Sequence, residues 1–201
     1  MTPQLYLITP PDAEPAALAA LLQQILVTAD ISAVLLRRGA RTEAVYLAFV
    51  DEIAPIGQAA GCAVLIEGND PKLAMALGVD GVHVDGSVAA VKAALAALKP
   101  NLIVGVGGVA SRHEAMSKGE QGVDYIMFGP LSGAIAPDVR ELAGWWAETM
   151  EIPSVLSDPE ATPASADAGG CEFLALSDSI WRADDPVAAI AAIAEGLDAT
   201  R

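Results

Sequence analysis

The sequence has no long hydrophobic run. No segment approaches the roughly 20 consecutive apolar residues that a membrane-spanning helix needs. The first residues, Met1 to Leu5, do not form a basic region followed by an apolar stretch, so we expect no secretory signal. A basic amphipathic helix that could lie on a membrane surface is also absent from the sequence. We therefore expect a soluble, cytoplasmic protein without a membrane partner.

Basic residues are scarce. The chain has 11 lysines and arginines against 26 aspartates and glutamates, which gives a formal net charge of −15. Such an acidic chain repels phosphate backbones, so we expect no nucleic-acid partner. A small phosphorylated ligand stays compatible with this composition, because the charge of one pocket can differ from the net charge of the chain.

Cysteine is scarce as well. The two cysteines, Cys62 and Cys171, lie in or just before apolar runs typical of strands. We expect buried free thiols rather than a disulfide, and two cysteines alone cannot form a structural zinc site.

Short apolar runs, by contrast, are abundant, and they alternate with amphipathic segments from end to end. Nearly continuous apolar runs of this length are typical of parallel strands that are covered on both faces. The predicted strands are Leu5–Thr9, Ala33–Leu36, Ala63–Ile66, Gly81–Val84, Leu102–Val106, Tyr125–Phe128, Ser154–Leu156 and Phe173–Leu176. The predicted helices are Pro15–Thr28, Thr42–Ala60, Ser87–Leu98, Arg112–Gly119, Asp138–Met150 and Pro186–Leu197.

The residues at the ends of these segments agree with this assignment. Ser111, followed three residues later by Glu114, fits a capping box that begins a helix. Gly61, Gly78 and Gly122 each stand just before a predicted strand, where a helix is expected to end. The chain therefore alternates strand and helix in a regular order.

Eight strand–helix units in 201 residues predict an α/β protein built as a single (β/α)8 TIM barrel over residues 1–201. Its functional pocket is expected at the carboxyl ends of the strands. A doubly wound open sheet is the alternative. The stretch from Gly105 to Gly108 does not have the G-x-G-x-x-G spacing of a dinucleotide site in such a sheet.

Several of these segments resemble the thiamine phosphate synthase family, which includes the TenI-like proteins. The resemblance rests on Leu5–Thr9, Leu35–Arg37, Asp80–Val84, Ile103–Val106 and Val123–Pro130. It implies a TIM-barrel transferase of thiamine biosynthesis, which joins a pyrimidine methyl diphosphate to a thiazole phosphate and releases pyrophosphate.

The chemistry that the resemblance implies requires cations. A leaving diphosphate is neutralised by Mg2+ held by carboxylates and by arginine or lysine, and a phosphate is bound by backbone N–H groups. By the resemblance, Arg37 and His83 are candidate catalytic residues, and Asp70 and Asp85 are candidate ligands of Mg2+. The candidate substrate-binding residues are Arg37, Arg38, Asn69, Asp85, Gly107, Gly108, Gly129, Ser157, Ser177 and Ser179.

The sequence departs from the family pattern where charge matters most. Gly39 replaces a lysine near Arg37, and the family's Thr/Lys pair is absent from residues 131–136. Asp70 and Asp85 stand one and three residues from the family's carboxylate positions, and a Gly-Gly pair becomes Ser157-Asp158-Pro159.

Two other functions therefore stay open. The first is a non-catalytic relative that binds a ligand or acts with a partner protein. The second is a metal-independent tautomerase that uses His83 or His113 as its acid and base. Apolar residues exposed on barrel helices would favour a homodimer.

Overall fold

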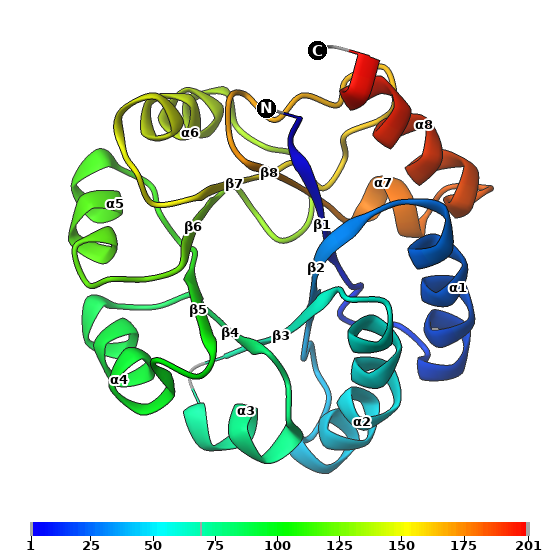
Figure 1. The fold of residues 1–201 in the computed structure, drawn as a ribbon, viewed down its shortest axis with the longest axis horizontal. Helices are drawn as coiled ribbons and strands as arrows, with labels where there is room; N and C mark the ends of the chain where they lie inside the picture. The colour runs from blue at the N-terminus through cyan, green and yellow to red at the C-terminus, as the bar shows by residue number, and fades with distance from the viewer. Residues whose placement is uncertain (1, 69, 200–201) are drawn as a thin grey trace.

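The computed structural model describes residues 2–68 and 70–199, in which eight parallel strands close into a barrel in the order β1 to β8. The predicted (β/α)8 architecture is confirmed, and the open-sheet alternative is wrong because β1 also pairs with β8. Figure 1 looks down the ring of strands, with the helices around it. The strands are β1 (Gln4–Ile8), β2 (Ile31–Leu36), β3 (Ala63–Glu67), β4 (Gly81–Val84), β5 (Ile103–Val106), β6 (Tyr125–Phe128), β7 (Ser154–Ser157) and β8 (Phe173–Leu176).

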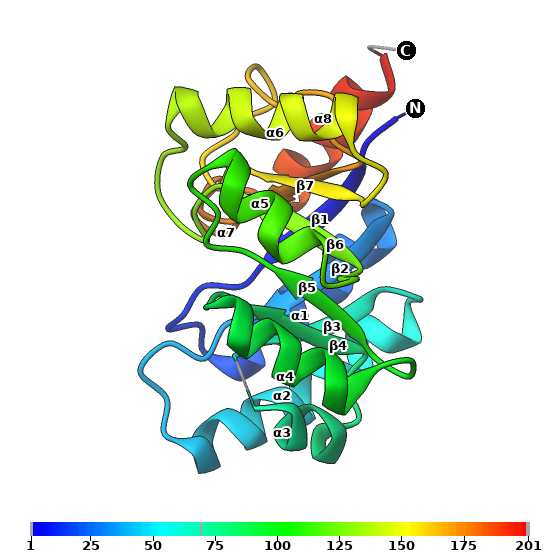
Figure 2. The ribbon, with the colours of Figure 1, turned by 90° about the vertical axis from the view of Figure 1, so that its left-hand side faces the viewer.

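The helices lie outside the barrel and cover the strands. Figure 2 shows that the two ends of the chain lie on the same side of the barrel. None of the described helices is both long and apolar enough to cross a membrane. The helices are α1 (Pro15–Thr28), α2 (Glu43–Ala59), α3 (Pro71–Leu77), α4 (Val88–Leu98), α5 (Arg112–Gly119), α6 (Pro137–Thr149), α7 (Asp178–Trp181) and α8 (Pro186–Ala199).

Local sequence explains where these helices begin and end. The Ser111 hydroxyl accepts a hydrogen bond of 3.2 Å from the Glu114 amide, as predicted, while the Glu114 carboxylate accepts from the Ala110 amide rather than from Ser111. At the other end of a helix, Gly78 has a φ of 64°. Glycine adopts this left-handed conformation without the steric cost of a Cβ atom, so α3 ends there.

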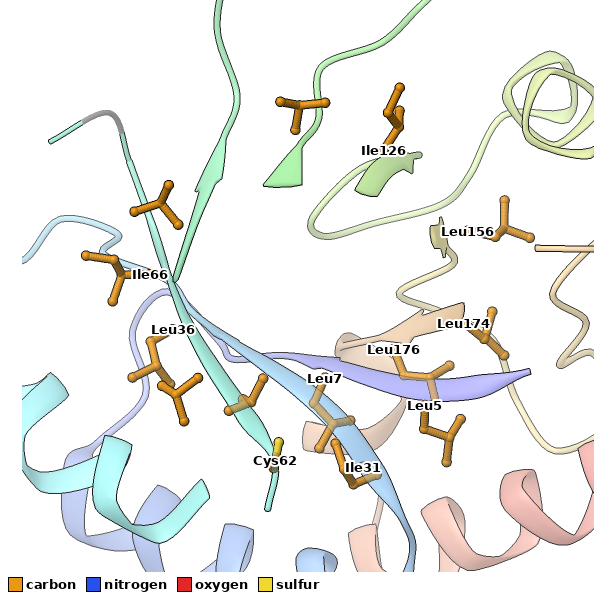
Figure 3. Close-up of a cluster of buried hydrophobic side chains, with 14 of the residues drawn as sticks. Leu5, Leu7, Ile31, Leu36, Cys62, Ile66, Ile126, Leu156, Leu174 and Leu176 are labelled. Carbon is orange, nitrogen blue, oxygen red and sulfur yellow. The ribbon is translucent and has the colours of Figure 1, made fainter. Parts of the chain in front are cut away.

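A large apolar layer lies between the strands and the helices. Figure 3 shows part of it, with Leu5, Leu7, Leu36 and Ile66 projecting from neighbouring strands. Both cysteines are buried and free, as predicted. Burial raises the pKa of Cys62 to about 12, which keeps its thiol protonated.

A second, smaller cluster fills the barrel interior. It contains Tyr6, Leu35, Leu65 and Tyr125 from four different strands. The glycine at position 105 makes room for this cluster, because a Cβ atom there would overlap the Tyr125 ring. The choice of glycine on β5 thus fixes the position of the tyrosine on β6.

We predict that Gly105→Ala lowers the free energy of unfolding by about 1–3 kcal/mol, the usual cost of overpacking a filled core. Gly196→Ala is the matched control. A Cβ atom there meets nothing closer than Pro163 O at 3.9 Å, and alanine is the better helix former. Urea denaturation of both variants measures the difference. Equal stabilities would show that Tyr125 can move without cost.

Candidate active site at the carboxyl ends of the strands

Arg37 follows β2 and shares the inward-facing parity of Ala33 and Leu35. Its amide donates to the Thr9 hydroxyl over 3.0 Å, which anchors the arginine to the end of β1. The guanidinium is largely buried, and its Nε atom lies 3.7 Å from Oε2 of Glu67, the last residue of β3.

This guanidinium has unused hydrogen-bonding capacity. Nε and Nη1 of Arg37 are both buried and have no hydrogen-bond partner among the described residues. Buried polar groups are normally paired, and an unpaired one points to a missing ligand or water. Arg37 can therefore donate to an anion at the barrel mouth.

The two neighbouring arginines are used locally. The Arg38 Nε atom donates to Arg41 O over 3.3 Å, and its guanidinium lies 6.0 Å from the centre of the Tyr46 ring. Arg41 donates to Pro11 O over 2.6 Å and stacks on Phe49 at 4.2 Å. These contacts tie the loop after β1 to the loop after β2. Arg41 also donates to Arg37 O over 3.3 Å, so its guanidinium lies near Arg37 but is used by backbone carbonyls.

Gly39 cannot be restored to a lysine in this backbone conformation. Its φ is 57°, and an added Cβ atom would overlap Pro11. The local loop therefore excludes a side chain at this position for steric reasons.

His83 lies on β4 inside the barrel and is 1% exposed. Its Nδ1 atom is 2.9 Å from the Tyr125 hydroxyl, which in turn is 3.1 Å from the Tyr6 hydroxyl. On its other side, Nε2 approaches the backbone of Gly107, where an added Cβ atom would lie only 2.6 Å away. The imidazole thus connects the interior tyrosines with the end of β5.

Burial, together with the nearby charge of Lys118, lowers the pKa of His83 to about 4. The imidazole is therefore neutral at neutral pH. A neutral imidazole can donate or accept one hydrogen bond but carries no charge for an anion.

We predict a pH dependence of stability from His83. Its pKa is near 6.5 in the unfolded chain and about 4 in the folded one. The unfolded chain therefore binds more protons between these pH values. The free energy of unfolding should fall by up to about 3 kcal/mol as the pH drops from 6.5 to 4.

Urea denaturation of the wild-type protein and of His83→Asn across this pH range measures the two stabilities. Their difference isolates the contribution of the imidazole, because both proteins have the same carboxylates. The variant should lose less stability on acidification. Parallel curves would contradict the buried, neutral state of His83.

The side chains of Lys118 and Asp85 meet the backbone of Gly107 and Gly108 just after β5. Lys118 reaches from α5 and donates to Gly107 O over 2.6 Å and to Gly108 O over 3.0 Å. The Asp85 carboxylate, which follows β4, lies directly against Gly108. Lys118 belongs to the predicted helix Arg112–Gly119, and its position in the sequence gives no sign that its long side chain returns to the end of β5.

The polar residues after β7 and β8 form the opposite side of the mouth. The hydroxyl of Ser157 donates to Pro130 O over 2.6 Å, and that of Ser177 donates to Ile8 O over 2.9 Å. The Ser179 hydroxyl is buried and has no partner among the described residues. Gly129 has a φ of 109° and packs against the backbone of Ser157. Among these three hydroxyl groups, that of Ser179 is the one that can still donate a hydrogen bond to a ligand.

The two aspartates on this side are paired with arginines. Asp158 forms an ion pair of 2.5 Å with Arg140, and Asp178 forms one of 3.3 Å with Arg182. The Asp178 carboxylate also accepts from the Gly133 amide over 3.0 Å. The negative charges that the sequence places in this region are thereby partly neutralised.

The candidate metal ligands do not form a ready-made cage. Asp70 caps α3 and accepts with Oδ1 from the Lys72 and Leu73 amides, at 3.0 and 3.4 Å, while Asp85 is exposed at the mouth. Within residues 2–68 and 70–199, no three His, Cys, Asp or Glu side chains gather as a metal site. Asn69, also predicted to bind substrate, lies outside the described residues.

A separate cavity of about 330 Å³ lies at the amino ends of the strands. Tyr6, Ala33, Leu65, Tyr125 and Val155 line it, and these side chains are mainly apolar. Such a lining has little to offer a charged ligand. The polar groups at the carboxyl ends are therefore the better candidates for an active site.

The chain is similar to proteins of one known family. The family described as "Thiamine monophosphate synthase" matches residues 5–175. A thiamine-phosphate synthase from Rhodospirillum centenum is 36% identical over 96% of this chain and 95% of its own length. One from Hyphomonas neptunium is 34% identical over 94% of this chain and 91% of its own length.

A solved structure has the same fold. Thiamine phosphate pyrophosphorylase from Pyrococcus furiosus superposes with a TM-score of 0.80, at 19% identity, over 98% of this chain and 96% of its own.

Proposed function

Since this chain belongs to the thiamine monophosphate synthase family, we propose that it joins a pyrimidine methyl diphosphate to a thiazole phosphate and releases pyrophosphate. In this proposal the C–O bond between the pyrimidine methylene group and the diphosphate breaks, and the bonding electron pair leaves with the diphosphate. The thiazole nitrogen forms the new C–N bond to the methylene carbon. We also propose that the reaction takes place in the cytoplasm.

The observation that carries the proposal is the buried guanidinium of Arg37. Its Nε and Nη1 atoms lack hydrogen-bond partners among the described residues, and in the proposed reaction a diphosphate is the leaving group at this end of the barrel. Charge-assisted hydrogen bonds from arginine to phosphate oxygens are strong and can be bidentate. Arg37 would thus stabilise the negative charge that develops on the leaving diphosphate.

The remaining candidates would bind and orient rather than react. His83, neutral and bound to Tyr125, would hold the end of β5 in place through its contact with Gly107. The Ser179 hydroxyl would donate to the ligand from the β8 side. The amides around Gly129, Ser157 and Ser177 would line the same opening.

Asp85 and Asp70 are the carboxylates that would hold Mg2+. Both cap bonds of Asp70 use Oδ1, which leaves Oδ2 for a metal, and Asp85 is exposed. Magnesium is commonly bound by one or two carboxylates together with substrate phosphates, and in this proposal the two aspartates would supply the carboxylates. The ion would neutralise charge on the diphosphate.

The direct test mixes the purified protein with the two phosphorylated substrates and Mg2+ and measures pyrophosphate release. The proposal expects release that depends on both substrates and declines when Mg2+ is chelated. A folded protein that binds either substrate without releasing pyrophosphate would instead be a non-catalytic relative.

We predict that Arg37→Ala raises the Kd for the pyrimidine methyl diphosphate about 10- to 100-fold, the loss expected for hydrogen bonds to a charged group. Lys92→Ala is the control, because Lys92 is an exposed cation on the outer helix α4. Calorimetric titration gives both affinities. An unchanged Kd for Arg37→Ala would remove Arg37 from the site.

A further inference from the structure

Lys118 is buried although it carries a charge. It is 6% exposed, and both of its described hydrogen bonds go to backbone carbonyls, those of Gly107 and Gly108. Among the described residues, no carboxylate forms an ion pair with it. A buried ammonium group that is held by carbonyls and forms no ion pair is costly to keep, so its position requires an explanation.

The two carbonyl bonds determine where the neighbouring amides point. In a trans peptide the C=O and N–H bonds lie on opposite sides. The carbonyls of Gly107 and Gly108 point to Lys118, which comes from the outer helix α5. The N–H groups of Gly108 and Val109 therefore point away from that helix, and neither donates to another described residue.

The backbone conformation favours convergence of these amides. Gly108 has a φ of 60°, the left-handed conformation that allows successive N–H groups to form a concave anion-binding nest. The groups around this turn include both signs of charge, since the Lys118 ammonium group donates to both carbonyls and the Asp85 carboxylate lies against Gly108. Two amides, a cation and a carboxylate are what a magnesium-bound phosphate group needs.

We propose that Lys118 is a positioning residue that holds the Gly107–Gly108 turn open for diphosphate and supplies a positive charge behind it. This inference rests on the proposed synthase function and deepens it. In this proposal, α5 supplies a cation for the diphosphate. The resemblance implies lysines at position 39 and within residues 131–136, and this sequence has none there.

The test uses inorganic diphosphate with Mg2+ as the probe. Calorimetric titration compares the wild-type protein with Lys118→Met and with Lys118→Gln, which keeps a donor for one carbonyl but removes the charge. Lys92→Met, an exposed lysine on α4, is the matched control. We expect both Lys118 variants to bind inorganic diphosphate at least about 10-fold more weakly, as for a hydrogen-bonded charge, and Lys92→Met to bind as the wild type does.

Steady-state kinetics separates positioning from a general loss of structure. The KM for the pyrimidine methyl diphosphate should rise in Lys118→Gln, whereas the KM for the thiazole phosphate should stay unchanged. In the wild-type protein, the amide NMR resonances of Gly108 and Val109 should shift when inorganic diphosphate is added. This last measurement does not depend on whether a variant folds.

The outcomes distinguish the two proposals. Two results would overturn the role of Lys118 and leave the synthase function standing, provided that the wild-type protein turns over. One is an unchanged KM for the pyrimidine methyl diphosphate in Lys118→Gln. The other is the absence of a shift in the Gly108 and Val109 amide resonances of the wild-type protein. A different result would support the anion site and overturn the synthase function. In it, the binding of inorganic diphosphate depends on Lys118, but the protein releases no pyrophosphate from the two substrates. No binding of inorganic diphosphate to the wild-type protein overturns the anion site.

Discussion

Closure of the barrel between β1 and β8 is the constraint on which the site depends. The pairing of Tyr6 with Ala175 joins the first strand to the last, and the alternation of side chains then decides which residues face the interior. The closure is reinforced at the mouth, where Ser177 and Trp181 both donate to the carbonyl of Ile8, over 2.9 and 2.7 Å. Without this seam, Arg37 and Ser179 would not follow strands of one closed barrel.

The interior hydrogen bonds extend this organisation across the barrel. Tyr6, Tyr125 and His83 come from β1, β6 and β4, and their polar atoms are 3.1 and 2.9 Å apart. These bonds satisfy polar groups in a water-excluded interior, where unpaired ones are expensive. Because His83 also contacts Gly107, the packing of the core is connected directly to the loop after β5.

The distribution of charge follows from the same geometry. The chain is acidic overall, yet the aspartates nearest the mouth after β7 and β8 are paired with Arg140 and Arg182. Arg37, which follows β2, and Lys118 on α5 are buried cations. In the described part of the chain, Arg37 keeps two atoms without hydrogen bonds beside its ion pair with Glu67, and Lys118 forms no ion pair. A strongly negative protein can in this way present an opening suited to an anion.

The sequence predicted the architecture because strand and helix periods repeat regularly, and the boundaries of β4, β6, β8 and α5 are those expected. Of the three glycines expected to end helices, Gly78 is the C-cap of α3, while Gly61 and Gly122 follow the caps of α2 and α5 by one and two residues; all three have a positive φ. The contacts of long side chains were not predictable. Lys118 returns to β5, Arg140 reaches Asp158, and Asp70 caps a helix, and none of these partners follows from spacing in the chain. The expected homodimer and the roles of the mouth residues stay predictions.

The most direct test of the central claim is a crystal structure of the wild-type protein soaked with Mg2+ and inorganic diphosphate. The account predicts diphosphate at the carboxyl ends of the strands, with oxygens on the Arg37 guanidinium. Diphosphate bound anywhere else on the protein, with Nε and Nη1 of Arg37 still without a hydrogen bond, would contradict it.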